Sequence, residues 1–188
     1  MNENSKVLRE IETVAKRHFF PIIGPAKARL LTRLIRRKKP GRIVEAGTLV
    51  GYSAIVMARS WTSSITTIEI NPRMSKIARK NIARAGFTKR VRIVTGDAKK
   101  ILPKLKGPFD FAFLDATKEE YLAYLKAIEK KMPEGSIVVA DNAGIFADEM
   151  QEYLDYVRKS GKYESKYYGK FANYRSGEED GMEISVKL

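Results

Sequence analysis

The sequence has 188 residues, a formal net charge of +14 and a hydrophobic fraction of 44%, values typical of one globular domain with a sizeable core. It contains no cysteine and one histidine, His18, which excludes disulfides, thiolate chemistry and histidine-rich metal sites. No segment approaches the ~20 consecutive apolar residues of a membrane span, and the N-terminus lacks an apolar core of the signal-peptide type. We therefore expect a cytoplasmic protein with no membrane partner, in which any metal is bound by oxygen atoms.

Two helices are predicted before the first strand. The first covers 5–20 and is broken by Pro21, and the second covers 25–37, where Pro25 suits a first helical position. Beyond them, short apolar segments alternate with helical patterns. The predicted strands are 42–46, 64–70, 91–96, 109–115 and 136–141, each followed by a helix, at 52–60, 71–86, 98–105, 118–131 and 145–160. Two last strands, near 162–171 and 181–188, form a predicted hairpin, whose aromatic residues Tyr163, Tyr167, Tyr168, Phe171 and Tyr174 are expected to pack on the sheet rather than line a pocket.

This alternation predicts an α/β fold: a Rossmann-like, doubly wound sheet of seven strands, mostly parallel, with an antiparallel C-terminal hairpin and N-terminal helices before it. We divide the single expected domain, 1–188, into N-terminal helices over 1–40 and an α/β core over 41–188. Ligands bind such sheets beyond the carboxyl ends of the strands, where the strand order reverses. The candidate site residues are therefore those that follow each strand.

The first strand leads into a turn between Gly47 and Gly51, in the segment "EAGTLVGYSA". Glycines here let a ligand approach the backbone at a helix N-terminus, and Glu45 lies just before the turn. Glu69 ends the second strand at a spacing typical of a carboxylate that binds ribose hydroxyls. Leu49 stands where a dinucleotide fingerprint has glycine, so the pattern favours a nucleoside cofactor without a pyrophosphate. The alternative is a structural glycine turn with a strand-end acid that caps the next helix.

Asp97 follows the third strand in the segment "TGDAKK". Its carboxylate is suited to the exocyclic amine of a base such as adenine. It is equally suited to the N-cap of the next helix. The two roles are compatible, and the sequence leaves both open.

Strands four and five end on Asp115 and on Asp141–Asn142. Neighbouring strands lie ~4.8 Å apart, so these side chains are expected to converge and offer an incomplete oxygen shell for a cation such as Mg²⁺. Lys118, one helical turn after Asp115, is a candidate general base. Taken singly, Asp115 could cap its helix, Asp141–Asn142 could form an Asx-turn and Lys118 could point into solvent. The combination favours a site.

Together with Glu69, the segments "VEAGTLVGYSA", "GDA", "FDFAFLDATKEEY", "VVADN" and "DGMEISVKL" resemble the metal-dependent class I S-adenosylmethionine (SAM)-dependent O-methyltransferases of the catechol and caffeoyl-CoA type. The resemblance extends from about residue 22 to the C-terminus. One departure is Thr117, which stands where that family usually has an acid.

The resemblance implies SAM as cofactor, with the methionine part near Glu45 and Gly47, the ribose at Glu69 and adenine at Asp97. The implied cofactor-binding residues are Glu45, Gly47, Thr48, Gly51, Ser53, Glu69, Asp97, Ala98 and Asp115. The implied ligands of a divalent metal, Mg²⁺ by preference, are Asp115, Asp141 and Asn142, and the implied catalytic base is Lys118. The expected reaction is methyl transfer to a hydroxyl of a small acceptor with adjacent oxygens, and homodimers are common among such relatives.

The charge is unevenly distributed along the chain. The region Lys27–Lys106 contains 21 Lys and Arg against three acids, a net charge of +18. Such a region can bind RNA, and some members of the family methylate hydroxyuridine in tRNA, so RNA is the alternative acceptor. A lysine-rich solvated surface is the simpler interpretation of the charge. A non-catalytic SAM-binding protein is a third hypothesis.

Overall fold

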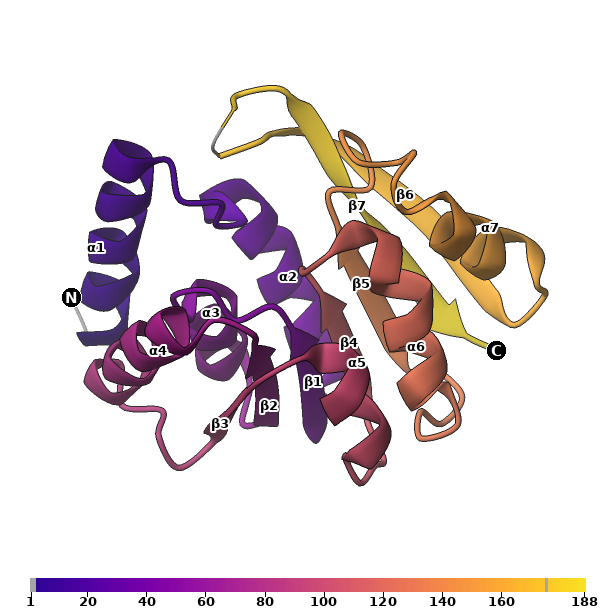
Figure 1. Cartoon of the computed structure of the whole chain (residues 1–188), viewed down its shortest axis with the longest axis horizontal. Coiled ribbons are helices and arrows are strands. Elements are labelled where there is room, and N and C mark those ends of the chain that lie inside the picture. The colour runs from indigo at the N-terminus through magenta and orange to yellow at the C-terminus, as the bar shows by residue number, and fades with distance from the viewer. Residues whose placement is uncertain (1–2, 175) are drawn as a thin grey trace.

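A computed structural model describes residues 3–174 and 176–188 (Figure 1). Helices α1 (Glu3–His18) and α2 (Gly24–Lys38) precede the sheet. The parallel part of the chain comprises β1 (Arg42–Ala46), α3 (Tyr52–Ser60), β2 (Ser64–Glu69), α4 (Pro72–Arg84), β3 (Val91–Thr95), α5 (Ala98–Ile101), the 3₁₀ turn η1 (Leu102–Lys104), β4 (Phe111–Leu114), the 3₁₀ turn η2 (Lys118–Glu120), α6 (Tyr121–Glu129) and β5 (Ile137–Asp141). Helix α7 (Gln151–Lys159) and strands β6 (Tyr163–Ala172) and β7 (Glu179–Lys187) follow.

The seven strands form one sheet in the order β3-β2-β1-β4-β5-β7-β6. Strands β1 to β5 pair in parallel, and β7 pairs antiparallel with both β5 and β6. This arrangement confirms the predicted fold class. The strand order reverses between β1 and β4, which places the switch point at the ends of these two strands.

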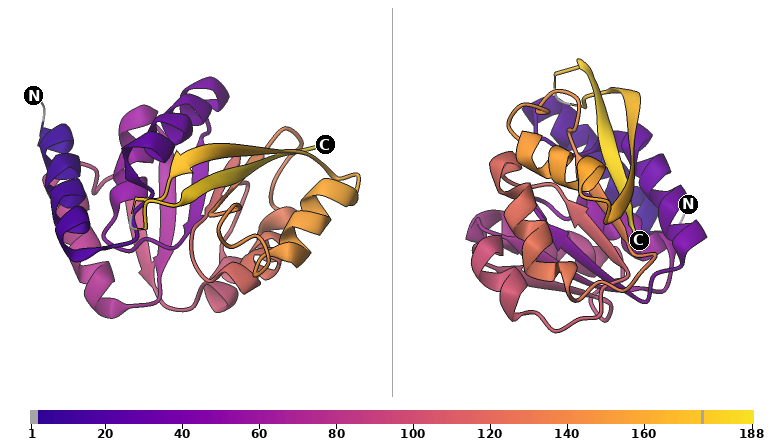
Figure 2. Two further views of the ribbon diagram at one scale, coloured as in Figure 1. Left: turned by 90° about the horizontal axis from the view of Figure 1, so that it is seen from above. Right: turned by 90° about the vertical axis from the view of Figure 1, so that its right-hand side faces the viewer.

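Helices cover both faces of the sheet (Figure 2). Helices α1 to α4 contribute to one apolar cluster and α5, α6 and α7 to the other. Successive residues of β4 alternate between them, because Phe111 and Phe113 face the first cluster whereas Ala112 and Leu114 face the second. A strand buried on both faces needs apolar residues at every position, which explains the unbroken run "FAFL".

Local signals determine where several elements begin and end. The Asn71 side chain accepts a hydrogen bond from the Arg73 backbone N–H at 2.9 Å, and Pro72 occupies the first helical turn of α4. Lys39 ends α2 in the left-handed region at φ 52°. Helix α4 follows β2 directly, so its N-terminus lies at the ligand-binding edge of the sheet.

Two predicted helices begin later than expected. Residues 118–120 form the 3₁₀ turn η2, so α6 begins at Tyr121, and α7 begins at Gln151 rather than at 145. Residues 142–150 form turns, with Asn142 at φ 64°. The backbone N–H of Ala143 donates to Gly181 O at 3.0 Å, so this segment is held by β7 instead of continuing a helix.

Candidate active site

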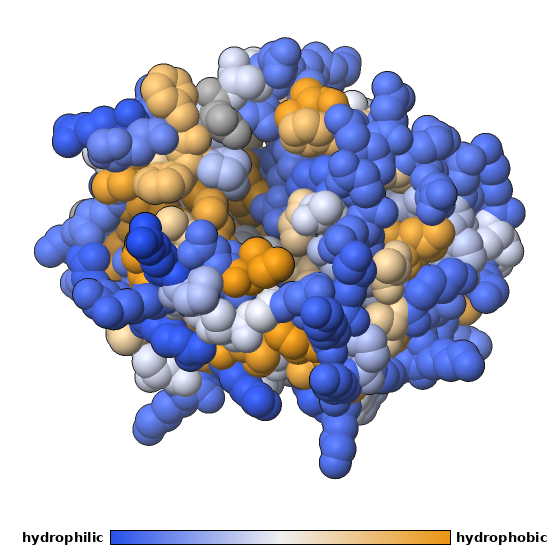
Figure 3. All heavy atoms as spheres, viewed as in Figure 1, coloured by the Kyte–Doolittle hydropathy of each residue, from blue (hydrophilic) through white to orange (hydrophobic). Residues whose placement is uncertain are grey.

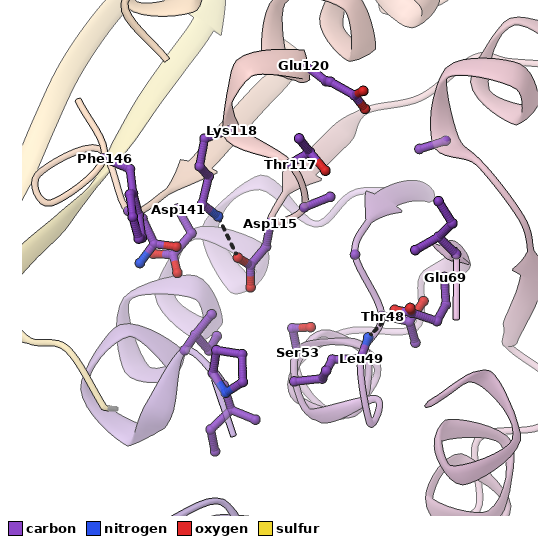
Figure 4. A pocket seen from close by; sticks show the side chains of 18 of the residues that line it. Thr48, Leu49, Ser53, Glu69, Asp115, Thr117, Lys118, Glu120, Asp141 and Phe146 are labelled. Carbon is purple, nitrogen blue, oxygen red and sulfur yellow. Dashed lines mark hydrogen bonds and ion pairs between the residues drawn. The ribbon is translucent and has the colours of Figure 1, made fainter. Parts of the chain in front are cut away.

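A cavity of about 680 Å³ opens at the carboxyl ends of β1, β2, β4 and β5. Figure 3 shows this face hollowed, with apolar residues on one wall and hydrophilic residues around the rim. Most of the predicted site residues line the cavity: Gly47, Thr48, Ser53, Glu69, Asp97, Ala98, Asp115, Lys118, Asp141 and Asn142. In Figure 4, Glu69 and Thr48 lie at one end, and Asp115, Lys118 and Asp141 point toward one another at the other end.

Gly47 permits a close approach between the ends of β1 and β4. A Cβ atom at this position would lie 1.9 Å from the backbone oxygen of Asp115, and the residue has φ 98°. The Gly47 N–H also donates to Ile68 O at 3.0 Å. Glycine is therefore required here by both space and backbone conformation. Gly51, at φ 87°, ends the same turn against Ala78 of α4.

Glu45 is completely buried beneath the turn. Its Oε1 accepts a hydrogen bond from the Ser53 hydroxyl, whereas its Oε2 has no hydrogen-bond partner among the described residues. Burial raises the pKa of Glu45 to about 8, although the hydrogen bond from Ser53 opposes the rise. An unpaired buried carboxylate oxygen has a desolvation cost that a cationic ligand group would remove.

Glu69 holds the turn together. Its Oε2 accepts the Leu49 N–H at 2.7 Å, and its Oε1 accepts the Asn71 N–H at 2.8 Å. Each carboxylate oxygen can accept a second hydrogen bond, so Glu69 can stabilise the turn and still bind the hydroxyls of a ligand. The structure thus adds a structural role to the predicted one.

Asp97 is the N-cap of α5, because its side chain accepts a hydrogen bond from the Lys99 backbone N–H at 2.8 Å. This geometry matches the capping interpretation of the sequence. One carboxylate oxygen forms the cap, and the residue lines the cavity next to buried Ala98. A ligand-binding role therefore remains compatible with the cap.

Asp115 and Lys118 form the expected pair at the end of β4. Lys118 Nζ lies 3.2 Å from Asp115 Oδ1 and donates to the Tyr121 hydroxyl at 2.7 Å. Both side chains of the pair are mostly buried, at 19% and 13% exposed. Tyr121, fully buried at the start of α6, thus orients the lysine over the cavity. The alternative in which Lys118 points into solvent is wrong.

Asp141 ends β5 beside Asp115, since β4 and β5 pair in register from Phe111–Ile137 to Leu114–Ala140. Burial raises the pKa of Asp141 to about 6, and Asp115 adds to the rise, while the ammonium groups of Lys27 and Lys118 oppose it. The structure therefore brings the acids of strands four and five together, as the sequence predicts.

The sequence analysis missed two residues at the acid–lysine end of the cavity, Lys27 and Asp180. Lys27 of α2 is 2% exposed, and its Nζ lies 2.6 Å from Asp141 Oδ1 and 2.5 Å from Asp180 Oδ2. Although burial lowers the pKa of Lys27, the two aspartates raise it above its ordinary value. The sequence signal was a single charge aligned with Leu31 and Ile35 on the apolar face of α2. Lys27 was assigned to the basic RNA-binding region, which is wrong because the side chain is buried.

The donor atoms fit a hard divalent cation. Asn142 donates through Nδ2 to Asp180 at 2.7 Å, so its Oδ1 is left for another partner beside the carboxylates of Asp115 and Asp141. No group of three or more His, Asp or Glu side chains in 3–174 and 176–188 is placed to hold a metal. A metal would therefore be held by two carboxylates and one amide, and no fully acidic cage is available.

Apolar and aromatic residues also line part of the cavity. Ile22, Ile145, Phe146 and Tyr174 line it. Tyr174 packs against Gly24, where a Cβ would lie 2.6 Å from its ring, and its hydroxyl donates to Glu12 O at 3.1 Å. The expectation of sheet packing holds for Tyr163, which is 5% exposed, but it is wrong for Tyr174.

No helix within the described ranges is long and apolar enough to cross a membrane. Comparisons with known proteins identify the family of this chain. The sequence profile of the O-methyltransferase family matches residues 1–160. Catechol O-methyltransferase B of Danio rerio is 34% identical over 175 residues, which are 88% of this chain and 65% of that protein. Catechol O-methyltransferase of Sus scrofa is 31% identical over 173 residues, 87% of this chain and 91% of that protein.

The fold also matches solved structures. The O-methyltransferase from Bacillus cereus in complex with SAH superimposes with a TM-score of 0.87 at 26% identity, covering 97% of this chain and 91% of that one. The sheet order and this structural match thus define a class I SAM-dependent methyltransferase fold. The chain belongs to the O-methyltransferase family, in its catechol and caffeoyl-CoA branch. It spans about two thirds or less of the length of several catechol O-methyltransferases that it matches.

Proposed function

We propose that this chain transfers a methyl group from SAM to a hydroxyl of a small acceptor that carries two adjacent oxygens, with a Mg²⁺-type cation at the site. The observation that carries the proposal is the arrangement of the cavity. Thr48 and Glu69 lie at one end of the hollow and Asp115, Lys118 and Asp141 at the other, so a cofactor and an acceptor bound there would share one cavity.

The cofactor end fits SAM in charge and shape. The unpaired Oε2 of Glu45, buried beneath the turn, would suit a ligand ammonium group. Gly47, Thr48 and Leu49 of the turn line the cavity, where the methionine part would lie. Glu69 has spare lone pairs for the ribose hydroxyls. Ile70 is 70% exposed at the cavity and offers an apolar surface for a flat base beside Asp97. Each part of the cofactor thus has a complementary group.

At the other end, Asp115, Asp141 and Asn142 would hold the cation, and Lys118 would accept the proton of the acceptor hydroxyl. When bound, SAM supplies an electrophilic methyl group and the cation supplies a Lewis acid that favours ionised oxygen. Tyr121 holds the Lys118 amine next to Asp115, and Phe146 lines the cavity where it would contact the acceptor. Positioning of the two ligands accounts for much of the expected rate.

The test is transfer of tritiated methyl from SAM to a vicinal diol on an aromatic ring, compared with the matched ring bearing one hydroxyl. We expect transfer only to the diol, loss of activity with a chelator and recovery with Mg²⁺. Lys118→Met should lower the rate about 100-fold or more by removing the general base, with unchanged binding of S-adenosylhomocysteine. Lys130→Met, an exposed lysine just beyond α6, is the matched control and should have no effect.

The outcomes separate the hypotheses. Activity that survives the chelator would refute the metal assignment alone. Tight SAM binding without transfer to any diol, and without an effect of Lys118→Met, would favour the non-catalytic alternative. Equal transfer to both rings would refute the requirement for two adjacent oxygens.

RNA is the second candidate acceptor, because of the charge on α4. This helix contains no acidic residue, exposes Arg73, Lys76 and Lys80, and begins two residues after cavity-lining Ile70. If the acceptor is RNA, unmodified tRNA should bind with an affinity that falls steeply between about 50 and 200 mM salt. Changing the three residues to glutamine should reduce that slope by about three. A slope near zero would remove RNA as the acceptor.

A further inference from the structure

Asp180, in β7, is a fully buried acid that contacts three separate parts of the site. Its Oδ2 accepts hydrogen bonds from Lys27 Nζ at 2.5 Å and from Asn142 Nδ2 at 2.7 Å. Its Oδ1 accepts the backbone N–H groups of Gly144 and Ile145, each at 3.3 Å. One carboxylate thus holds α2, the residue after β5 and the turn that follows it.

The contact with Asp180 determines which atom of Asn142 faces the cavity. An ionised carboxylate only accepts hydrogen bonds, so the amide must direct Nδ2 toward Asp180. The amide oxygen then points away from Asp180, and Asn142 lines the cavity. Asn142 also has φ 64°, a backbone conformation that the bonds from Gly144 and Ile145 to Asp180 help to maintain.

Lys27 acts on Asp141 in a comparable way. Its ammonium group bonds to Asp141 Oδ1 at 2.6 Å, which leaves Oδ2 as the oxygen free of the lysine. Lys27 reaches this point from a helix that lies 114 residues earlier in the chain, and Asp180 anchors it from the opposite side. A carboxylate restrained in this way would offer a cation one oxygen at a defined position.

We propose that Asp180 and Lys27 are positioning residues of the cation site. Asp180 orients the amide oxygen of Asn142, and Lys27 restricts Asp141 to one free oxygen, so that the ligands are arranged before the cation arrives. The inference rests on the cation site of the proposed function. Groups that orient metal ligands in this way typically contribute about 10- to 100-fold to metal affinity.

The experiment measures Mn²⁺ alone, because free Mn²⁺ can be titrated by its electron paramagnetic resonance signal. We expect Asp180→Asn to bind Mn²⁺ about 10- to 100-fold more weakly than the wild type. Aspartate offers two acceptor oxygens at this position, whereas asparagine offers one. Either the donors that bond to Oδ2 (Lys27 and Asn142) or the backbone N–H groups that bond to Oδ1 therefore lose their acceptor. Lys27→Met, which keeps the length of the side chain, should weaken Mn²⁺ binding in the same range.

The control is Glu183→Gln. Glu183 is a buried acid on the same strand, paired with Arg158 at 2.7 Å, and it does not line the cavity. This variant should bind Mn²⁺ like the wild type. Binding of S-adenosylhomocysteine, measured by calorimetry, should be unchanged in all three variants, which separates positioning of the cation ligands from general loss of structure.

Each result supports or overturns the proposal. Wild-type Mn²⁺ affinity in Asp180→Asn would overturn it. Tighter Mn²⁺ binding by Lys27→Met would overturn the role of Lys27, since the ammonium would then only compete with the cation. A wild-type protein that binds no Mn²⁺ would refute the cation site itself, whereas Mn²⁺ binding with unaffected variants would refute only the positioning.

If the variants do not fold, a crystal structure of the wild type tests the positioning roles of Asp180 and Lys27. In a crystal structure with Mn²⁺ and S-adenosylhomocysteine, we expect one oxygen each from Asp141 and Asn142 on the metal, with Lys27 and Asn142 still bonded to Asp180. Displacement of the Lys27 ammonium by the metal, or binding of Asp141 through both oxygens, would overturn the proposal.

Discussion

Replacing Glu45 with glutamine should stabilise the protein without cofactor at alkaline pH and weaken cofactor binding. Glu45 is completely buried, and its Oε2 has no partner among the described residues. Burial raises its pKa from 4.5 to about 8 in the folded protein. At a pH between 4.5 and about 8, Glu45 of the folded protein holds a proton that the same residue of the unfolded chain has released. Raising the pH through this range therefore lowers the free energy of unfolding.

The size of the effect follows from the same pKa. Where the folded group is protonated and the unfolded group is ionised, each pH unit lowers stability by about 1.4 kcal/mol. The loss is smaller close to pH 8, where the folded group also ionises. Between pH 6 and pH 8 the Glu45 contribution is thus about 2 kcal/mol, or roughly 4–8 °C in the melting temperature of a protein of this size. Glu45→Gln cannot ionise and lacks this contribution.

The assay is thermal and urea unfolding of the wild type and Glu45→Gln at pH 6 and pH 8 without cofactor. The wild type should lose about 2 kcal/mol more than the variant between the two conditions. Calorimetry with SAM should show weaker binding by the variant, because the amide cannot acquire the negative charge that Glu45 gains when it releases its proton to pair with the ligand ammonium. Equal pH dependence in both proteins would refute the assignment of a raised pKa to Glu45.

Two further predictions concern the turn and the third strand. Gly47→Ala should cost about 2–5 kcal/mol, because a Cβ would lie 1.9 Å from Asp115 O and the backbone has φ 98°; urea unfolding measures this. Asp97→Ala should cost about 1 kcal/mol through loss of the α5 N-cap, whereas Asp97→Asn should keep the cap. Both Asp97 variants should weaken binding of S-adenosylhomocysteine if the carboxylate binds adenine.

Matched variants serve as controls for the Gly47 and Asp97 predictions. Gly86 has φ 81°, but a Cβ added there would have nothing within 4 Å, so Gly86→Ala should cost only about 1–2 kcal/mol of backbone strain. If Gly47→Ala costs no more than this, the close approach to Asp115 is unimportant. If Asp97→Asn binds S-adenosylhomocysteine like the wild type, Asp97 is a helix cap and has no role that requires its charge.

The parallel part of the fold was predictable because its signals are local. Each of β1 to β5 is a short segment with an acidic residue within two positions of its last residue, and glycine, proline or asparagine limits several of the helices between them. The start of α7 was wrong by six residues for a physical reason. Residues 142–150 are held by hydrogen bonds to Asp180 and Gly181, which are far away in the sequence.

Part of the candidate site was also predictable from the sequence, and part of it depends on residues that are distant in the sequence. Asp115, Asp141 and Asn142 converge because they end neighbouring parallel strands, a consequence of topology that the sequence pattern contains. The partners of Lys27 lie 114 and 153 residues away, so no local pattern identifies them. Only its alignment with apolar residues on α2 indicated burial.

The position of β7 affects the order in which the site can form during synthesis. The proposed nucleoside-binding end uses the ends of β1, β2 and β3, and the last of these strands ends at Thr95. In the proposed site, the cation-binding end needs Asp180, whose strand β7 inserts between β5 and β6. A nascent chain on the ribosome can therefore complete the nucleoside-binding end long before it can orient Asn142. Premature termination before residue 179 would leave a chain that retains the cofactor-binding residues but lacks the anchor of Lys27.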